Sequence, residues 1–210
     1  MTKSQADLFA SLARSFSTER LSTYRRPSES DGLVLARYLW NVELCEALYP
    51  VLHALEVALR NSMHDAISVA CGRNDWYDIV PLILQQDDVD RVVAAKRELA
   101  KQASRKKIPL ARFQTPGRVV AELNFGFWTS LLSRSYESHD PVHPRLWPRL
   151  FLSVFPKARK LGRHRAAARF NGLRHLRNRA SHHEPIWSDP HIMQRHAELL
   201  EAMGWINPDL

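Results

Sequence analysis

Apolar residues recur along almost the whole chain at three- and four-residue spacing, and this pattern limits what the chain can fold into. On an α-helix the spacing places apolar side chains on one face, where they pack against another helix. The sequence contains no convincing alternation of apolar and polar residues, which would indicate half-buried strands. The sequence therefore predicts an all-α protein.

The predicted helices begin and end at prolines, glycines and capping residues. Pro50 is expected to open a helix, because proline is tolerated in the first turn. Gly72 is expected to cap a helix end, and Pro185 is expected to end the long basic helix before it. Loops are expected at 26–32 and 138–144. The expected helices cover residues 5–16, 18–24, 33–48, 51–69, 87–101, 116–132, 146–155, 162–183 and 190–203.

The composition is that of a folded protein without long disorder. Of 210 residues, 45% are hydrophobic, 25% are charged and only 7 are glycine. No linker divides the sequence, so we expect a single helical domain over residues 1–210. Cys45 and Cys71 form no CxxC pair, which argues against a disulfide framework and fits a reducing cytoplasm. The sequence shows neither an apolar leader nor a stretch of about 20 apolar residues, so we expect a cytoplasmic protein without membrane contact.

Positive charge gathers in the last third of the chain. The formal net charge is +8, and residues 141–183 contain no Asp or Glu. Such a surplus favours a polyanionic partner, and its localisation fits contact with a phosphate backbone. The residues expected to bind RNA are Lys157, Arg159, Lys160, Arg163, Arg165, Arg169, Arg174 and Arg179.

One cluster within this basic segment is suited to chemistry. Arg177 is followed by Asn178, and His182 comes one helical turn after Asn178 on the same face. A guanidinium stabilises the charge that a phosphate gains in the transition state of RNA cleavage. A histidine transfers protons near neutral pH, and an amide holds a phosphate oxygen or fixes the histidine tautomer. Two copies meeting across a symmetric homodimer would supply both an acid and a base.

Several stretches, taken in order, resemble a known family. Arg177, Asn178 and His182 are similar to the HEPN motif, in which an arginine and a polar residue precede a histidine by a short spacer. The stretches that resemble the Abi-like abortive-infection family span most of the chain, and they are 20–24, 38–41, 55–61, 125–128 and 176–186.

The resemblance implies a HEPN-like helical bundle with additional N-terminal and peripheral helices. It also implies a metal-independent endoribonuclease toxin of phage defence, with no cofactor, restrained by an antitoxin that is a small structured RNA or a protein. Carried onto this sequence, it makes Arg177, Asn178 and His182 the catalytic residues, with the adjacent His183 as the alternative imidazole. The residues of the family-like run 55–61 that are expected to support catalysis are Glu56, Arg60 and Asn61.

Other interpretations of the same residues stay open. Arg177 and Arg179 can decorate a solvated basic face, and His182 and His183 can oppose the dipole at a helix end. A metal site built from His175, His182 and His183 lacks a carboxylate or thiolate to complete it. The competing function is a noncatalytic RNA-binding module held in a ribonucleoprotein or toxin–antitoxin complex, which predicts salt-sensitive binding without turnover.

Overall fold

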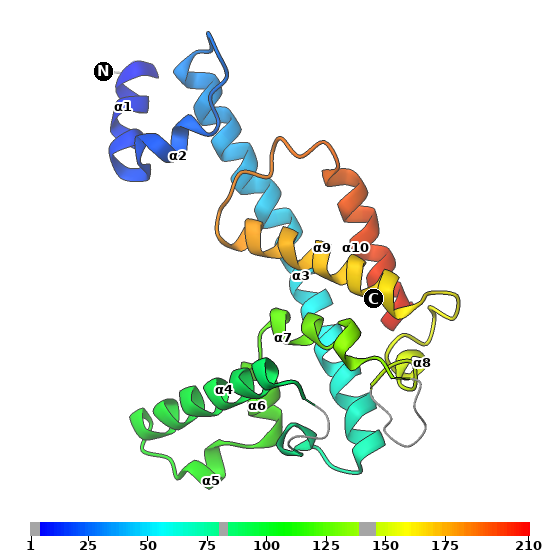
Figure 1. Cartoon of the computed structure of the whole chain (residues 1–210). Coiled ribbons are helices and arrows are strands. Elements are labelled where there is room, and N and C mark those ends of the chain that lie inside the picture. The colour runs from blue at the N-terminus through cyan, green and yellow to red at the C-terminus, as the bar shows by residue number, and fades with distance from the viewer. Residues whose placement is uncertain (1–4, 80–83, 139–145) are drawn as a thin grey trace. The chain divides into compact units, whose positions relative to one another are not determined.

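The computed structural model describes residues 5–79, 84–138 and 146–210 (Figure 1). Throughout these ranges the regular secondary structure is helical, so the predicted all-α class is confirmed. None of the helices in these ranges combines the length and the apolar character that crossing a membrane requires. The α-helices are α1 (Gln5–Phe16), α2 (Thr18–Ser22), α3 (Asp31–Cys71), α4 (Gln86–Arg105), α5 (Leu110–Phe113), α6 (Pro116–Glu122), α7 (Phe125–Ser130), α8 (Phe151–Val154), α9 (Arg163–Ser181) and α10 (Ile192–Ile206), and short 3-10 helices cover Trp76–Asp78 and Arg134–Tyr136.

The backbone groups into two compact units. The first comprises the chain up to Leu52 together with His175–Ala197, and the second comprises His53–Arg174 together with Glu198–Leu210. The points of division fall inside α3, α9 and α10, so each of these helices contributes to both units. The single domain expected over residues 1–210 stays a prediction.

The first unit packs around a small core supplied by α2, the turn after it and the start of α3. Its buried members are Leu21, Tyr24, Val34 and Leu35. Half-buried side chains from α1, α3 and the segment after α9 pack against them, and these are Phe9, Leu12, Ala13, Tyr38 and Trp187. These contacts hold the N-terminal helices, the start of α3 and the segment after α9 together.

The second unit has a larger core that is rich in aromatic rings. Trp76 and Trp128 pack edge to face with ring centroids 6.4 Å apart. Phe155 stacks on Phe170 of α9 at 5.4 Å between centroids. In the same unit, α4 lies beside α5 and α6 (Figure 1). Aromatic pairs of this kind stabilise a core beyond the area that they bury.

Gly72 marks the end of α3 as the sequence predicted. Its φ of 68° is in the left-handed region that glycine adopts without strain. The N–H of Arg73 donates to the carbonyl of Ser68 at 3.1 Å, and the N–H of Gly72 donates to Val69 at 3.4 Å. This pair of bonds is a Schellman cap, so the predicted helix end is confirmed.

Several of the predicted helix boundaries are wrong, and the helix expected over 146–155 covers only Phe151–Val154. Pro50 lies inside α3 instead of opening a new helix. The helix expected over 116–132 is interrupted, because the side chain of Asn124 accepts the N–H of Phe127 at 3.0 Å and so begins α7. The loop expected at 138–144 lies, from residue 139 on, outside the described residues.

Candidate active site

The last turns of α9 bring the predicted catalytic residues together. The N–H of His182 donates to the carbonyl of Asn178 at 2.9 Å, so the two side chains lie one turn apart, as their spacing indicated. The guanidinium of Arg177 approaches the amide of Asn178, with Nη1 and Oδ1 3.5 Å apart. Arg177 and Asn178 are half-buried and His182 is exposed. The three residues therefore lie near one helix end, and none of their side chains is fully buried.

His183 occupies the position after the helix end. Its φ is 57°, in the left-handed region. The N–H of Glu184 donates to the carbonyl of Arg179 at 2.8 Å, and the N–H of His183 donates to Ala180 at 3.2 Å. Together these bonds form a Schellman cap with a histidine where glycine is usual. The helix expected to reach His183 therefore ends two residues earlier, at Ser181.

The carbonyl of His183 is also fixed from α2. Nη2 of Arg20 donates to that oxygen at 2.6 Å. Arg20 belongs to the family-like stretch 20–24, to which sequence analysis gave no role in the site. The bond positions the backbone of the cap from a residue far away in the sequence.

Asn41 of α3 holds the segment that follows the cap. Its side chain is 2% exposed. Oδ1 accepts the backbone N–H groups of Ile186 at 2.7 Å and Trp187 at 3.0 Å, and Nδ2 donates to the carbonyl of Glu184 at 3.5 Å. One buried amide thus replaces the hydrogen bonds that water would make to this loop. Sequence analysis included Asn41 in a family-like stretch but missed this positioning role.

Arg179, expected to bind RNA, is engaged with the same loop. Its guanidinium donates to the carbonyl of Pro185 and lies 3.8 Å from the carboxylate of Glu184 and 3.6 Å from that of Asp189. Burial favours a higher pKa for Asp189, but the N–H of His191, Arg195 and Arg179 together hold its pKa below the usual value. Arg179 therefore stabilises the loop, and its contact with RNA stays a prediction.

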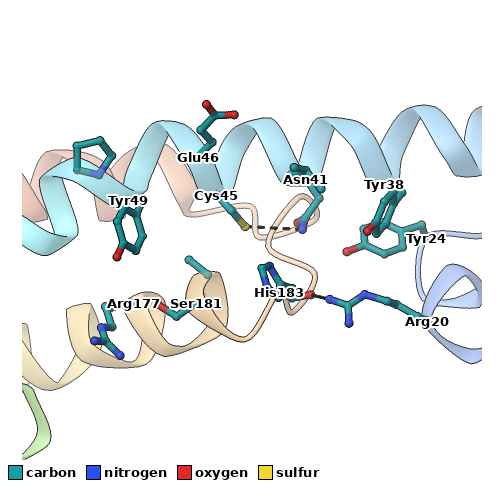
Figure 2. A pocket seen from close by; sticks show the side chains of 13 residues that line it. Arg20, Tyr24, Tyr38, Asn41, Cys45, Glu46, Tyr49, Arg177, Ser181 and His183 are labelled. Carbon is teal, nitrogen blue, oxygen red and sulfur yellow. Dashed lines mark hydrogen bonds between the residues drawn. The ribbon is translucent and has the colours of Figure 1, made fainter. Parts of the chain in front are cut away.

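A pocket of about 630 Å³ opens beside this helix end, and every residue that lines it belongs to the first unit. Figure 2 shows Arg177, Ser181 and His183 at the end of α9, facing Tyr49, Cys45 and Asn41 of α3. The lining residues are Arg20, Tyr24, Tyr38, Asn41, Val42, Cys45, Glu46, Tyr49, Pro50, Arg177, Ala180, Ser181 and His183. His182 is not one of them.

The thiol of Cys45 is part of the pocket wall. Burial raises the pKa of this thiol, and the positive charge of Arg179 opposes that shift only in part. Burial therefore favours the thiol over the thiolate, which is the nucleophilic form. The polar chemistry of the pocket comes from its guanidinium, hydroxyl, amide and imidazole groups.

The residues expected to support catalysis belong to the second unit. Glu56, Arg60 and Asn61 lie on α3 beyond the point of division at Leu52. Nε of Arg60 donates to Oδ1 of Asn61 at 3.3 Å. Glu56 and Arg60 are half-buried, and Asn61 is exposed. Their support of catalysis stays a prediction.

The residues expected to bind RNA in the second unit differ in their contacts and exposure. Arg163 donates to Glu137 and to the carbonyl of Leu132, both at 2.9 Å, and Arg169 donates to Glu201 at 2.6 Å while its guanidinium lies over the ring of Trp205. These two arginines hold the unit together. Arg174 is half-buried on α9. The exposed cations line a second pocket of about 580 Å³, and they are Lys157, Arg159, Lys160 and Arg165.

The chain matches the family of Abi-like proteins over residues 8–188. It belongs to this family. The matched range of this Abi-like protein includes the pocket and the cluster of Arg177, Asn178 and His182. The match relates the protein to abortive infection. No curated protein and no solved structure matches the chain.

Proposed function

We propose that this Abi-like protein is a HEPN-type, metal-independent endoribonuclease that acts as a toxin in abortive infection. The observation that supports the proposal most directly is the guanidinium of Arg177. It borders a pocket, lies beside the amide of Asn178, and is followed by two imidazoles, His182 and His183, just past the end of the helix. A phosphate bound there meets a positive charge, an amide and a proton-transfer group at one helix end.

In the proposed reaction, the 2′-oxygen of a ribose attacks the adjacent phosphorus while the 5′-oxygen of the next nucleotide leaves. The 2′-hydroxyl gives its proton to a base, and an acid protonates the leaving oxygen. Arg177 stabilises the negative charge that develops on the phosphate oxygens, and Asn178 positions one of them. His182 transfers a proton. The products carry a 2′,3′-cyclic phosphate and a 5′-hydroxyl, and the electron count balances without a metal or cofactor.

The reaction needs an acid and a base, and we propose that a homodimer supplies them. Each copy would contribute its own His182 across a two-fold axis. Exposed apolar side chains on the part of α3 in the first unit support a second copy as partner. Leu39 is 58% exposed, Trp40 50% and Tyr49 59%. Several large apolar side chains exposed on one stretch of helix are typical of a protein–protein interface.

The test is RNA cleavage by purified protein in EDTA. Labelled transfer RNA and an unstructured RNA are incubated with wild type, Arg177→Ala and His182→Ala, and the product ends are analysed. We expect wild type alone to yield cyclic phosphate ends. His164→Ala is the matched control, because His164 is an exposed histidine at the other end of α9. Cleavage that survives replacement of both His182 and His183 would refute the assignment.

A noncatalytic RNA-binding module is the second candidate. The four exposed cations around the second pocket favour it, because none of them forms an ion pair within the described parts of the chain. Glu201 also lines this pocket, but its carboxylate pairs with Arg169. Salt-sensitive RNA binding by wild type and by His182→Ala alike, without cleavage by either, would support this candidate. The same basic surface is where an RNA antitoxin would bind.

A further inference from the structure

Two buried hydrogen-bond donors line the pocket of the first unit without a partner. Tyr24 is 0% exposed, and its hydroxyl makes no hydrogen bond within the described parts of the chain. Nε of Arg20 is likewise buried there and without an acceptor. Polar groups buried in a folded protein are nearly always hydrogen-bonded, because leaving one unsatisfied is costly. Two such groups in one pocket indicate a ligand that accepts hydrogen bonds from both.

The two unpartnered donors lie at the same end of the pocket. Figure 2 shows Arg20, Tyr24 and Tyr38 gathered at one end and Arg177 with Tyr49 at the other. Burial raises the pKa of Tyr24, so its hydroxyl is protonated at neutral pH and can donate. Glu46 is the acidic lining residue, and its carboxylate points away from Arg177 in Figure 2. Each end of the pocket thus offers a guanidinium and a tyrosine ring, and the two unpartnered donors lie at the end formed by Arg20 and Tyr24.

We propose that this pocket binds one unpaired nucleotide of single-stranded RNA, with its base at Arg20 and Tyr24 and its phosphate at Arg177. A base unstacked from its neighbours commonly rests against tyrosine rings, and a phosphate pairs with a guanidinium. The pocket volume of about 630 Å³ lies within the range typical of binding sites for small organic ligands, which includes a mononucleotide. The identity of this nucleotide as substrate rests on the proposed ribonuclease function.

The donors also predict which bases fit. An arginine Nε–H only donates, so the edge that faces it must present acceptors. Guanine offers O6 and N7, and uracil offers O4, whereas adenine and cytosine present an exocyclic amino group at the corresponding position. We therefore expect guanine or uracil to be preferred over adenine and cytosine.

The test is binding, which needs no cleavage. The four nucleoside 5′-monophosphates and inorganic phosphate are titrated into the protein by calorimetry, beside single-stranded oligonucleotides made uncleavable by 2′-deoxy substitution. We expect GMP or UMP to bind at least about tenfold more tightly than AMP, CMP or phosphate, because a site built to hydrogen-bond one group rejects a ligand that lacks it. Oligonucleotides rich in the same base should bind more tightly still.

Tyr24→Phe removes only the hydroxyl. Since that hydroxyl has no partner among residues 5–79, 84–138 and 146–210, the Tm should stay the same or rise. The affinity for the preferred nucleotide should fall about tenfold, and the base preference should vanish. Tyr77→Phe is the matched control, because Tyr77 is buried in the second unit and lies outside the pocket. Arg20→Lys keeps the charge and removes Nε, so it should lose base preference as well.

The outcomes separate this proposal from the ribonuclease. Nucleotides that bind no better than phosphate, or equally well to Tyr24→Phe, would overturn it. Binding of free nucleotides without binding of the oligonucleotides would also overturn it, in favour of a small nucleotide ligand. Base-selective oligonucleotide binding that Tyr24→Phe abolishes, in a protein that never cleaves RNA, would support the pocket and refute the ribonuclease.

Discussion

The residue with the most unusual backbone at the candidate site is His183. A side chain in the left-handed region brings its Cβ close to the following carbonyl, which costs about 1 kcal/mol relative to glycine. His183→Gly should therefore raise the free energy of unfolding by about 1 kcal/mol, as measured by urea denaturation. The bond from Arg20 should persist, because its acceptor is a backbone carbonyl. A loss of stability would mean that the imidazole itself holds the cap.

The same variant separates the two adjacent imidazoles. If His182 transfers the proton, His183→Gly keeps its cleavage activity while His182→Ala loses it. The opposite result would assign the proton transfer to His183, the one of the two that borders the pocket. A histidine kept where glycine is easier to accommodate would then have a functional reason.

At the residue scale, contacts between residues close in the sequence were predictable, and contacts between distant segments were not. The proximity of Arg177, Asn178 and His182 near one helix end was predictable because helical spacing indicates it, whereas their catalytic role stays a prediction. Asn41 contacts Ile186 across 145 positions of sequence, and nothing in the spacing of either residue indicates that contact. The burial of Tyr24 and Arg20 beside the end of α9 was missed for the same reason, because it depends on packing between distant segments.

At the scale of elements, α3 is attached to the loop after α9 through Asn41. Asn41→Ala would leave the buried N–H groups of Ile186 and Trp187 without an acceptor, which should lower the free energy of unfolding by about 3 kcal/mol. Hydrogen exchange at those two amides should accelerate. Asn41→Asp is the control, because it keeps an oxygen for both donors and should lose less stability than Asn41→Ala. Equal losses would show that the amide's own donor, and not its acceptor, matters.

Pro50 lies inside α3 and removes one of the hydrogen bonds of this helix. It has no N–H for the carbonyl of Glu46, and its ring crowds the preceding turn. Pro50→Ala should therefore raise the free energy of unfolding by about 1–3 kcal/mol in urea denaturation. Pro116→Ala is the control, since Pro116 stands in the first turn of α6 and should change stability by only a few tenths of a kcal/mol. Destabilisation by Pro50→Ala would show that packing around Pro50 requires the proline.

Some helix boundaries were predictable because a local sequence rule marks them. Gly72 follows such a rule, because glycine is by far the best residue for a left-handed cap. Pro50 does not, since proline is compatible with a first turn and tolerated at a cost inside a helix that tertiary packing supports. Asn124 was overlooked because the apolar pattern runs on through 116–132, and a single capping side chain interrupts it.

For the whole molecule, the all-α class followed from periodicity, but the distribution of the basic residues over two units did not. The sequence grouped the residues from Lys157 to Arg179 as one basic segment. In the structure Arg163 forms an ion pair with Glu137, and Arg169 forms one with Glu201. Charge counted along a chain overstates the charge available to a partner, because ion pairs form between segments that the sequence keeps apart.

The proposed dimer makes a quantitative prediction for mixed subunits. If each site needs an imidazole from both copies, a dimer of one wild-type and one His182→Ala subunit has no complete site. After equal amounts of the two proteins are mixed and allowed to exchange, activity per total protein should fall to about one quarter of wild type. A copy that works alone would give about one half. His164→Ala mixed with wild type in the same way should leave full activity. In the mixtures with His182→Ala, activity that depends linearly on the wild-type fraction would place the acid and the base within one chain.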